Sequence, residues 1–259
     1  MNRPMPLPIA QLNDIYGTWM RMPFMREYFA GSGHFNVGLW SHGAASAADA
    51  GANLMERLLA FVPDKHGRVL DVACGLGATT RHLLRYYPPG DVCAIDVGRG
   101  TLREARDRAA AAHFSRMDAT RLGYAADTFQ TVVCVESAFH FNTRQDFLRE
   151  AWRVLEPGGT LLTSDILFGR KLGAWRIGVP PANDVPSLEA YRELYHRAGF
   201  DHVVLEDALD CTWRPFREDI KRAAKARRAG GQLATPLYWI VNTLMDAEVA
   251  FYPLVAATK

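Results

Sequence analysis

Short apolar runs alternate with longer helical stretches from residue 67 onward. The runs that predict strands are 68–72, 92–96, 113–116, 131–135 and 160–165. Between them, apolar residues recur at helical spacing, and these stretches are 79–87, 101–112 and 143–155. Strands that alternate with helices in this way predict a parallel sheet covered by helices, joined by right-handed crossovers.

The flanking segments follow a different pattern. Residues 1–60 are expected to be helical, and the Gly- and Pro-rich stretch 168–186 predicts a long loop. A helix is expected between Ser187, a favoured N-cap residue, and Gly199, a favoured residue just past a helix end. Two further strands, with helical sequence between them, are predicted at 202–205 and 251–257.

Length and composition suit one large α/β unit with a modest cap. The chain has 259 residues, of which 49% are hydrophobic and 22% charged. We expect an N-terminal helical lid region at 1–60 and one main domain at 61–259. Two cap elements are expected within the main domain, at about 168–199 and 213–246.

Charge and cysteine content exclude several classes of protein. A formal net charge of +2 gives no global field that would favour nucleic acid or an anionic membrane. The four cysteines form no CxxC pair and lie at no zinc-ligand spacing, so we expect reduced thiols, no metal site and a cytoplasmic location. There is no secretory signal pattern, and polar residues and Pro253 interrupt the apolar stretch 236–257, so no membrane span is expected.

A glycine-rich turn follows the first predicted strand. The stretch 69–80 reads V-L-D-V-A-C-G-L-G-A-T-T, and Asp96 ends the next strand, where a carboxylate can accept hydrogen bonds from ribose hydroxyls. A nicotinamide cofactor is disfavoured, because Thr80 replaces the third glycine and Asp71 would repel a pyrophosphate. A cationic nucleoside such as S-adenosylmethionine, with a sulfonium and an ammonium, suits this acidic setting better.

The order of motifs resembles class I S-adenosylmethionine-dependent methyltransferases. DVACGLG is followed by IDVG, MDAT, VVCVESAFHF and RVLEPGG, and the terminal YPLVAATK is similar to the closing strand of that family. The resemblance implies a Rossmann-like, doubly wound α/β fold whose seven-stranded sheet has an antiparallel last strand. It also implies the residues that bind S-adenosyl-L-methionine: Asp71, Ala73, Gly75 and Gly77 at the methionine part, Asp96 and Val97 at ribose and adenine, Met117, Asp118 and Ala119 at adenine, Glu136 at the end of the fourth strand facing the cofactor, and Trp40 in a segment that closes over the methionine end.

His140 and Asp165 resemble the His and Asp of sugar O-methyltransferases of antibiotic biosynthesis. That resemblance implies that His140 removes the proton of an acceptor hydroxyl and that Asp165 orients the imidazole or binds a second hydroxyl. Aromatic residues near the sheet edge are expected to bind the acceptor, and those selected are Tyr16, Phe139, Phe141 and Trp175. The expected activity is therefore methylation of a hydroxyl on a small-molecule natural product of secondary metabolism, or on its sugar, by a monomer or homodimer.

Other activities remain open from the sequence. C-methylation of an isoprenoid, quinone or aromatic ring would use Glu136 or His140 to stabilise positive charge or remove a ring proton. N-methylation of a heterocycle is a third possibility. A protein that binds the cofactor without catalysis, as a partner in a biosynthetic complex, is an alternative of a different class.

Overall fold

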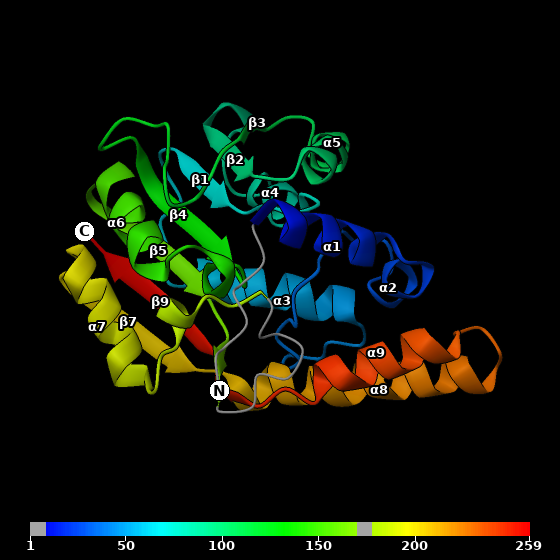
Figure 1. Ribbon diagram of the computed structural model, residues 1–259. Helices are drawn as coiled ribbons and strands as arrows, with labels where there is room; N and C mark the ends of the chain where they lie inside the picture. The colour runs from blue at the N-terminus through cyan, green and yellow to red at the C-terminus, as the bar shows by residue number, and fades with distance from the viewer. Residues whose placement is uncertain (1–8, 170–177) are drawn as a thin grey trace.

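One seven-stranded sheet forms the centre of the molecule (Figure 1). The computed structural model describes residues 9–169 and 178–259 of the chain. Five strands are parallel and correspond to the predicted runs; they are β1 (Val69–Val72), β2 (Val92–Asp96), β3 (His113–Arg116), β4 (Phe129–Val135) and β5 (Leu155–Ser164). The strand order is β3-β2-β1-β4-β5-β9-β7. The strand order therefore reverses between β1 and β4. Ligands of open α/β sheets bind at such a switch point.

The last strand is antiparallel, as the family resemblance implies. β9 (Pro253–Thr258) lies between β5 and β7 (His202–Asp207) and pairs antiparallel with both. A second, two-stranded sheet joins β6 (Leu167–Phe168) to β8 (Val249–Phe251). These observations confirm the predicted Rossmann-like fold with seven strands and an antiparallel final strand.

Helices cover both faces of the sheet. One face packs against α3 (Ala47–Leu59) and α4 (Ala78–Leu83), and α5 (Arg99–Arg108) packs on β2 through Ala105 and Ala94. The other face packs against α6 (Arg144–Val154) and α7 (Leu188–Ala198). Ser187 and Gly199 bound α7 as predicted, since the Ser187 side chain accepts from the amide of Ala190 and Gly199 takes a left-handed conformation.

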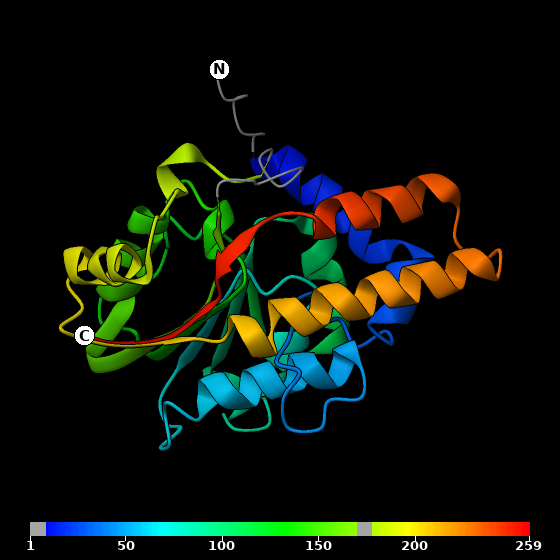
Figure 2. The same cartoon turned by 90° about the horizontal axis from the view of Figure 1, so that it is seen from below.

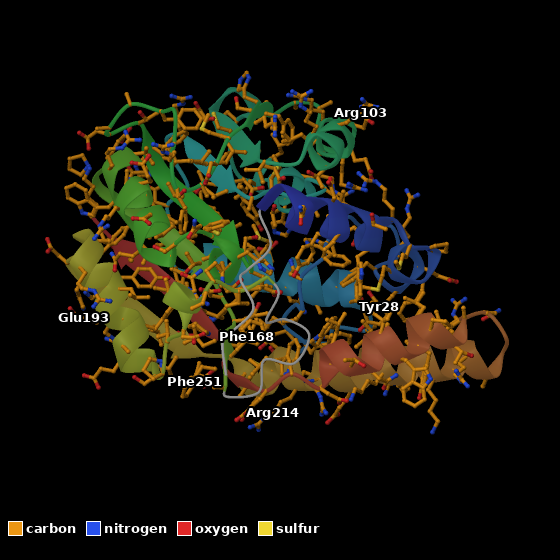
Figure 3. All side chains as sticks on the ribbon, in the orientation of Figure 1. Tyr28, Arg103, Phe168, Glu193, Arg214 and Phe251 are labelled. Atoms are coloured by element: carbon orange, nitrogen blue, oxygen red, sulfur yellow. The ribbon has the colours of Figure 1, made fainter. Side chains whose placement is uncertain are left out.

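Four helices lie beyond the carboxyl edge of the sheet. They are α1 (Ile9–Arg21), α2 (Pro23–Tyr28), α8 (Trp213–Ala229) and α9 (Thr235–Met245). The α8–α9 hairpin projects alongside α1 and α2 in both views (Figures 1 and 2). Tyr28 joins the two groups by donating to Asp219 Oδ2 at 3.0 Å (Figure 3).

Ion pairs fix α8 to its neighbours. Its basic residues pair with acids on adjacent segments, Lys221 with Asp246 and Arg227 with Glu27. Within the two described ranges, no helix is both long enough and apolar enough to cross a bilayer.

Candidate active site

The loops after β1 and β2 meet at the carboxyl edge of the sheet. Asp96, at the end of β2, accepts from the amide of Gly75 at 3.0 Å and from the amide of Gly98 at 2.7 Å. Burial raises the pKa of Asp96, and these amides oppose that effect. The Thr101 hydroxyl also donates to Oδ1 of Asp96, at 3.1 Å. Because each carboxylate oxygen has two acceptor sites, Asp96 keeps capacity at Oδ2 for a ribose hydroxyl.

A cavity of about 160 Å³ lies over these loops, and we call it the cofactor cavity. Ala73, Gly75, Asp96 and Val97 line it. At Gly75, where φ is +52°, a Cβ would meet no atom within 4 Å, so the backbone is open to a ligand. Among the described lining residues, Asp96 and Glu136 are acidic and none is a lysine or arginine, so the cavity suits a cationic nucleoside such as S-adenosyl-L-methionine.

Glu136 holds the N-terminal segment against the end of β4. Its carboxylate accepts from the amide of Val37 at 2.9 and 3.0 Å and from the hydroxyl of Tyr252. Burial raises the pKa of Glu136 to about 7, against the opposing effect of these donors. Residues 34–37 therefore lie over the sheet edge, where His34, Phe35 and Asn36 line the cofactor cavity.

His140 has one fixed imidazole nitrogen and one that faces the site. Nδ1 donates to the carbonyl of Gly178 at 2.5 Å, so Nε2 is the acceptor, and the Tyr16 hydroxyl donates to it at 2.7 Å. Burial lowers the pKa of His140 to about 4. The imidazole is therefore neutral near pH 7, with its basic nitrogen directed at the position that Tyr16 fills.

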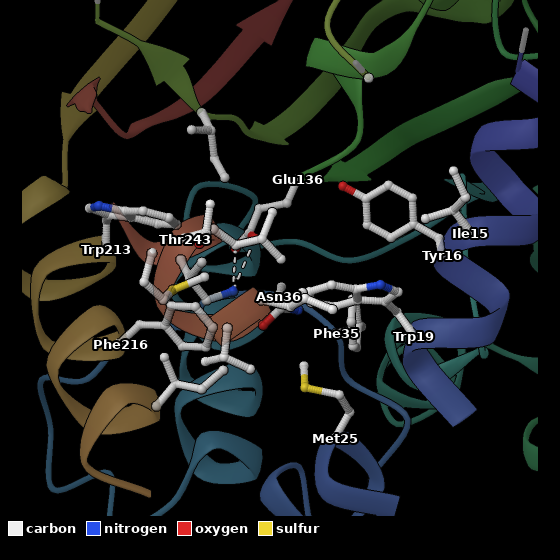
Figure 4. Close-up of a pocket in the computed structure, with 18 of the residues that line it drawn as sticks. Ile15, Tyr16, Trp19, Met25, Phe35, Asn36, Glu136, Trp213, Phe216 and Thr243 are labelled. Atoms are coloured by element: carbon white, nitrogen blue, oxygen red, sulfur yellow. Dashed lines mark hydrogen bonds between the residues drawn. The ribbon is translucent and has the colours of Figure 1, made fainter. Parts of the chain in front are cut away.

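A second cavity, of about 440 Å³, adjoins the first, and we call it the acceptor cavity. Side chains from α1 lie on one side of it and Trp213 and Phe216 of α8 on the other (Figure 4). Most of its lining is aliphatic or aromatic, and its volume is in the range that binds drug-sized molecules.

The two cavities share a boundary. The residues that line both are Tyr16, Phe35, Asn36, Glu136 and His140. A methyl donor in one cavity and an acceptor in the other would meet at this boundary, which is where an in-line displacement needs both reactants.

Asp165 follows the fifth parallel strand, as predicted, but its contacts differ from the predicted ones. Its carboxylate is fully buried and accepts from Arg144 Nε at 2.7 Å and from the Tyr191 hydroxyl at 2.8 Å. The contact that orients the imidazole comes from Gly178 instead. Asp165 is not among the described residues that line either cavity, and its charge raises the pKa of His140. Its binding of a second hydroxyl stays a prediction.

Three residues expected at the methionine part of the cofactor have structural contacts. Asp71 accepts from the hydroxyls of Thr79 and Thr80, both at 2.6 Å, and thereby joins β1 to α4. Gly77 begins α4 with φ +83°, and a Cβ there would lie 2.9 Å from Ala105 Cα. Trp40 donates to the carbonyl of Val37. None of the three is among the described residues that line the two cavities, and their contact with the cofactor stays a prediction.

The turn expected at adenine lies outside the cofactor cavity. Asp118 Oδ1 accepts from the amide and hydroxyl of Thr120, Met117 Sδ accepts from the amide of Gly123, and Ala119 is buried. Their contact with adenine stays a prediction. Asp118 follows β3, whose neighbour β2 carries the ribose-side Asp96.

The expected acceptor-binding residues are divided between the cavities. Tyr16 lines both, and Phe139 lines the acceptor cavity, whereas Phe141 lines the cofactor cavity. Trp175 lies outside the described residues. All four cysteines are free.

Sequence reasoning missed several lining residues. His34 Nδ1 and Asn36 Oδ1 are buried polar atoms without a hydrogen-bond partner among the described residues. Their polar side chains between the aromatic residues of 34–40 were the available signal, but only the aromatic ones were singled out. Ile240 of α9 was also missed, because helical spacing alone does not show which face meets the site.

Comparison with known proteins identifies relatives that cover about two thirds of the chain or more. A family model described as "Methyltransferase domain" matches residues 69–159. Erythromycin 3''-O-methyltransferase of Saccharopolyspora erythraea is 31% identical over 205 residues, which are 71% of this chain and 67% of that protein. The 27-O-demethylrifamycin SV methyltransferase of Amycolatopsis mediterranei is 31% identical over 194 residues, 68% of this chain and 69% of that protein.

Among solved structures, the [4+2]-cyclase SpnF has a TM-score of 0.77 at 22% identity, over 98% of each chain, and this likeness concerns the fold. The relatives at 31% identity, the matched domain and the sheet order agree with one another. The chain therefore belongs to the class I methyltransferases and is an S-adenosyl-L-methionine-dependent methyltransferase.

Proposed function

We propose that this enzyme methylates a hydroxyl group of a small-molecule natural product or of its sugar, with His140 as the general base. The single observation that supports this most strongly is the position of His140 Nε2, a neutral acceptor at the boundary of the two cavities. Glu136 is the other residue at this boundary that the sequence predicts as catalytic. Few side chains there can therefore take the proton of an acceptor hydroxyl. The named activities of the erythromycin and rifamycin relatives support the same class of reaction.

The proposed step is a displacement with a proton transfer. Bound S-adenosylmethionine supplies an electrophilic methyl group on a sulfonium sulfur. The acceptor oxygen forms the new bond to that carbon as the carbon–sulfur bond breaks, and its proton passes to Nε2 of His140. Gly178 keeps Nδ1 protonated, so the nitrogen that accepts the proton is fixed by the backbone.

Tyr16 marks the position of the acceptor hydroxyl. Its hydroxyl donates to His140 Nε2 at 2.7 Å, which is the contact that the acceptor would make. Tyr16 belongs to α1, so this side chain turns away or α1 shifts when the acceptor binds. Residues 1–60 would then act as a lid over the site.

Replacement of His140 tests the role of the base. His140→Ala should lower kcat by roughly 100-fold to 10,000-fold, the usual contribution of general base catalysis, with little change in the Kd for S-adenosylhomocysteine. A radiolabelled methyl-transfer assay with macrolide and ansamycin acceptors measures the first, and titration calorimetry the second. His202→Ala, at an exposed position on β7, is the matched control. Full turnover by His140→Ala would remove this residue from the mechanism.

C-methylation is a second candidate because Glu136 also lies at the boundary. Its carboxyl, with a pKa of about 7, could take a proton from a ring carbon. Carbon-13 NMR of a product made with labelled methyl groups distinguishes the two reactions, since methyl carbons on oxygen and on carbon have separate chemical shifts.

A further inference from the structure

The titratable and amide side chains that line the acceptor cavity lie together at its boundary with the cofactor cavity, which we call the inner end. They belong to four of the five residues shared with the cofactor cavity: Tyr16, Asn36, Glu136 and His140. Asn36 is 6% exposed, and its Oδ1 has no hydrogen-bond partner among the described residues. A buried acceptor left unpaired costs roughly 1–3 kcal/mol, so Asn36 is suited to a hydrogen-bond donor of a ligand.

Most of the remaining described lining is apolar, apart from the hydroxyl of Thr243 on α9 and the indole N–H groups of the tryptophans. Met25 lies beyond Asn36 on the α2 side, and Trp213 and Phe216 come from α8 (Figure 4). Phe29 and Ile220 also line the cavity. Among the described lining residues, Glu136 and His140 are the only acidic or basic ones. The other ionisable group is the phenol of Tyr16. A molecule bound in this cavity therefore meets polar side chains at one end and mostly apolar side chains along its length.

The outer end is also apolar, and it is exposed. Ile15 of α1 is 45% exposed, and Trp239 and Ile240 of α9 are 61% and 43% exposed. All three line the acceptor cavity. The described residues include four exposed large hydrophobic side chains, and only Val204 of β7 lies away from the cavity. The exposed apolar surface is thus continuous with the cavity, and we call these three residues the rim.

We propose that the acceptor is an uncharged, elongated amphiphile that enters with its hydroxyl-bearing end first and is longer than the cavity. One hydroxyl reaches His140, a neighbouring hydroxyl pairs with Asn36, and the apolar body leaves the cavity across the rim between α1 and α9. This inference rests on the proposed function for the identity of the reacting hydroxyl, and it adds the shape, charge and orientation of the acceptor.

Charge at the inner end supports an uncharged acceptor. An anionic group there would meet the carboxyl of Glu136 and would lose its hydration without a described cationic side chain to replace it. A neutral diol instead finds an acceptor at Asn36 and another at His140. Exposed rim residues gain the most from a partner whose apolar surface continues past the cavity mouth.

Binding of simple amphiphiles tests the inference without turnover. Titration calorimetry on the protein saturated with S-adenosylhomocysteine would compare 1-hexanol, 1-octanol, 1-decanol, 1,2-decanediol and decanoate at pH 8. Each added methylene should tighten binding about fourfold. The diol should bind more tightly than 1-decanol, and decanoate at least tenfold more weakly.

Two variants locate the ends of the probe. Trp239→Ala should weaken 1-decanol about tenfold and leave 1-hexanol unchanged, whereas Val204→Ala, at the exposed apolar position away from the cavity, should change neither. Asn36→Ala should remove the advantage of the diol over 1-decanol. Circular dichroism and the Tm of each variant show that the protein is folded, since Asn36 also lines the cofactor cavity and its replacement can change the Kd for S-adenosylhomocysteine.

Specific results would overturn the inference. They are decanoate binding as tightly as 1-decanol, unchanged 1-decanol affinity in Trp239→Ala, or a retained diol advantage in Asn36→Ala. Because no methyl transfer is measured, failure of these predictions is distinct from failure of the proposed O-methylation, which the His140 assay tests.

Discussion

Glu136 contacts three parts of the chain at once. Its carboxyl accepts from Val37 of the N-terminal segment and from Tyr252 before β9, and its amide donates to the carbonyl of Ser164 at the end of β5. Its φ of +48° is unusual for a residue with a side chain and directs it toward the site edge. The residue is thus a structural clamp as well as a lining residue, a combination that its position in the motif did not indicate.

The raised pKa of Glu136 predicts a pH-dependent stability difference. A carboxyl whose pKa rises on folding, here to about 7, stabilises the fold most at low pH, and this contribution is lost as pH rises through about 7. Glu136→Gln lacks this loss, so its Tm relative to the wild type should increase between pH 5 and pH 8. Thermal unfolding by circular dichroism at several pH values measures the difference.

The matched control is Glu193→Gln, since Glu193 lies on the outer surface of α7 (Figure 3). It should show a constant Tm difference over the same range. If the two variants gave the same pH dependence, the carboxyl of Glu136 would not be the group responsible.

At the scale of elements, α4 and α5 come close together beside the glycine loop. Gly77 is the point of contact, because its missing Cβ lets Ala105 of α5 approach. The glycine pattern predicted the loop correctly, but it did not distinguish a glycine that faces the ligand, such as Gly75, from one that faces a helix. That distinction depends on the position of α5, which is set by packing on β2 and is not visible in the motif itself.

Gly77→Ala should destabilise the protein by about 1–3 kcal/mol, from the combined effects of the left-handed φ and the close contact with Ala105. Urea unfolding measures this free energy. Gly90→Ala provides the comparison, because a Cβ at Gly90 would meet nothing within 4 Å and its φ lies outside the left-handed region. Equal effects of the two substitutions would contradict the packing role of Gly77.

At the scale of the whole molecule, two kinds of structure meet at the active site. The sheet and its loops form the cofactor side, and they follow from strand periodicity and from motif order, which is why the fold was predictable. The acceptor side is built from α1, α2, α8 and α9, which are distant in sequence and meet only in the folded protein. Their helical spacing predicted helices, yet it could not place Trp213, Phe216 and Trp239 around one cavity.

Binding at the cofactor side should stabilise the entire fold by mass action. S-adenosylhomocysteine at 100 times its Kd should add about 2.7 kcal/mol, equivalent to a Tm increase of roughly 5–10 °C for a chain of this size. Asp96→Ala should lose this increase, because it removes the ribose-side carboxylate, and Asp210→Ala, at an exposed acid, should keep it. Differential scanning fluorimetry with and without the ligand compares the increments. A full increment in Asp96→Ala would show that this carboxylate contributes little to binding.

The hydrogen bond from His140 to Gly178 lets the acceptor cavity change in sequence without moving the base. The group that fixes the base is a main-chain carbonyl, so it is supplied whatever side chains neighbouring positions carry. The acceptor wall, by contrast, includes many side chains of α8 and α9. Substitutions in that hairpin can therefore change which molecules are accepted while the proton-accepting atom stays in place, and α8–α9 is the segment in which to build a library for altered substrate range.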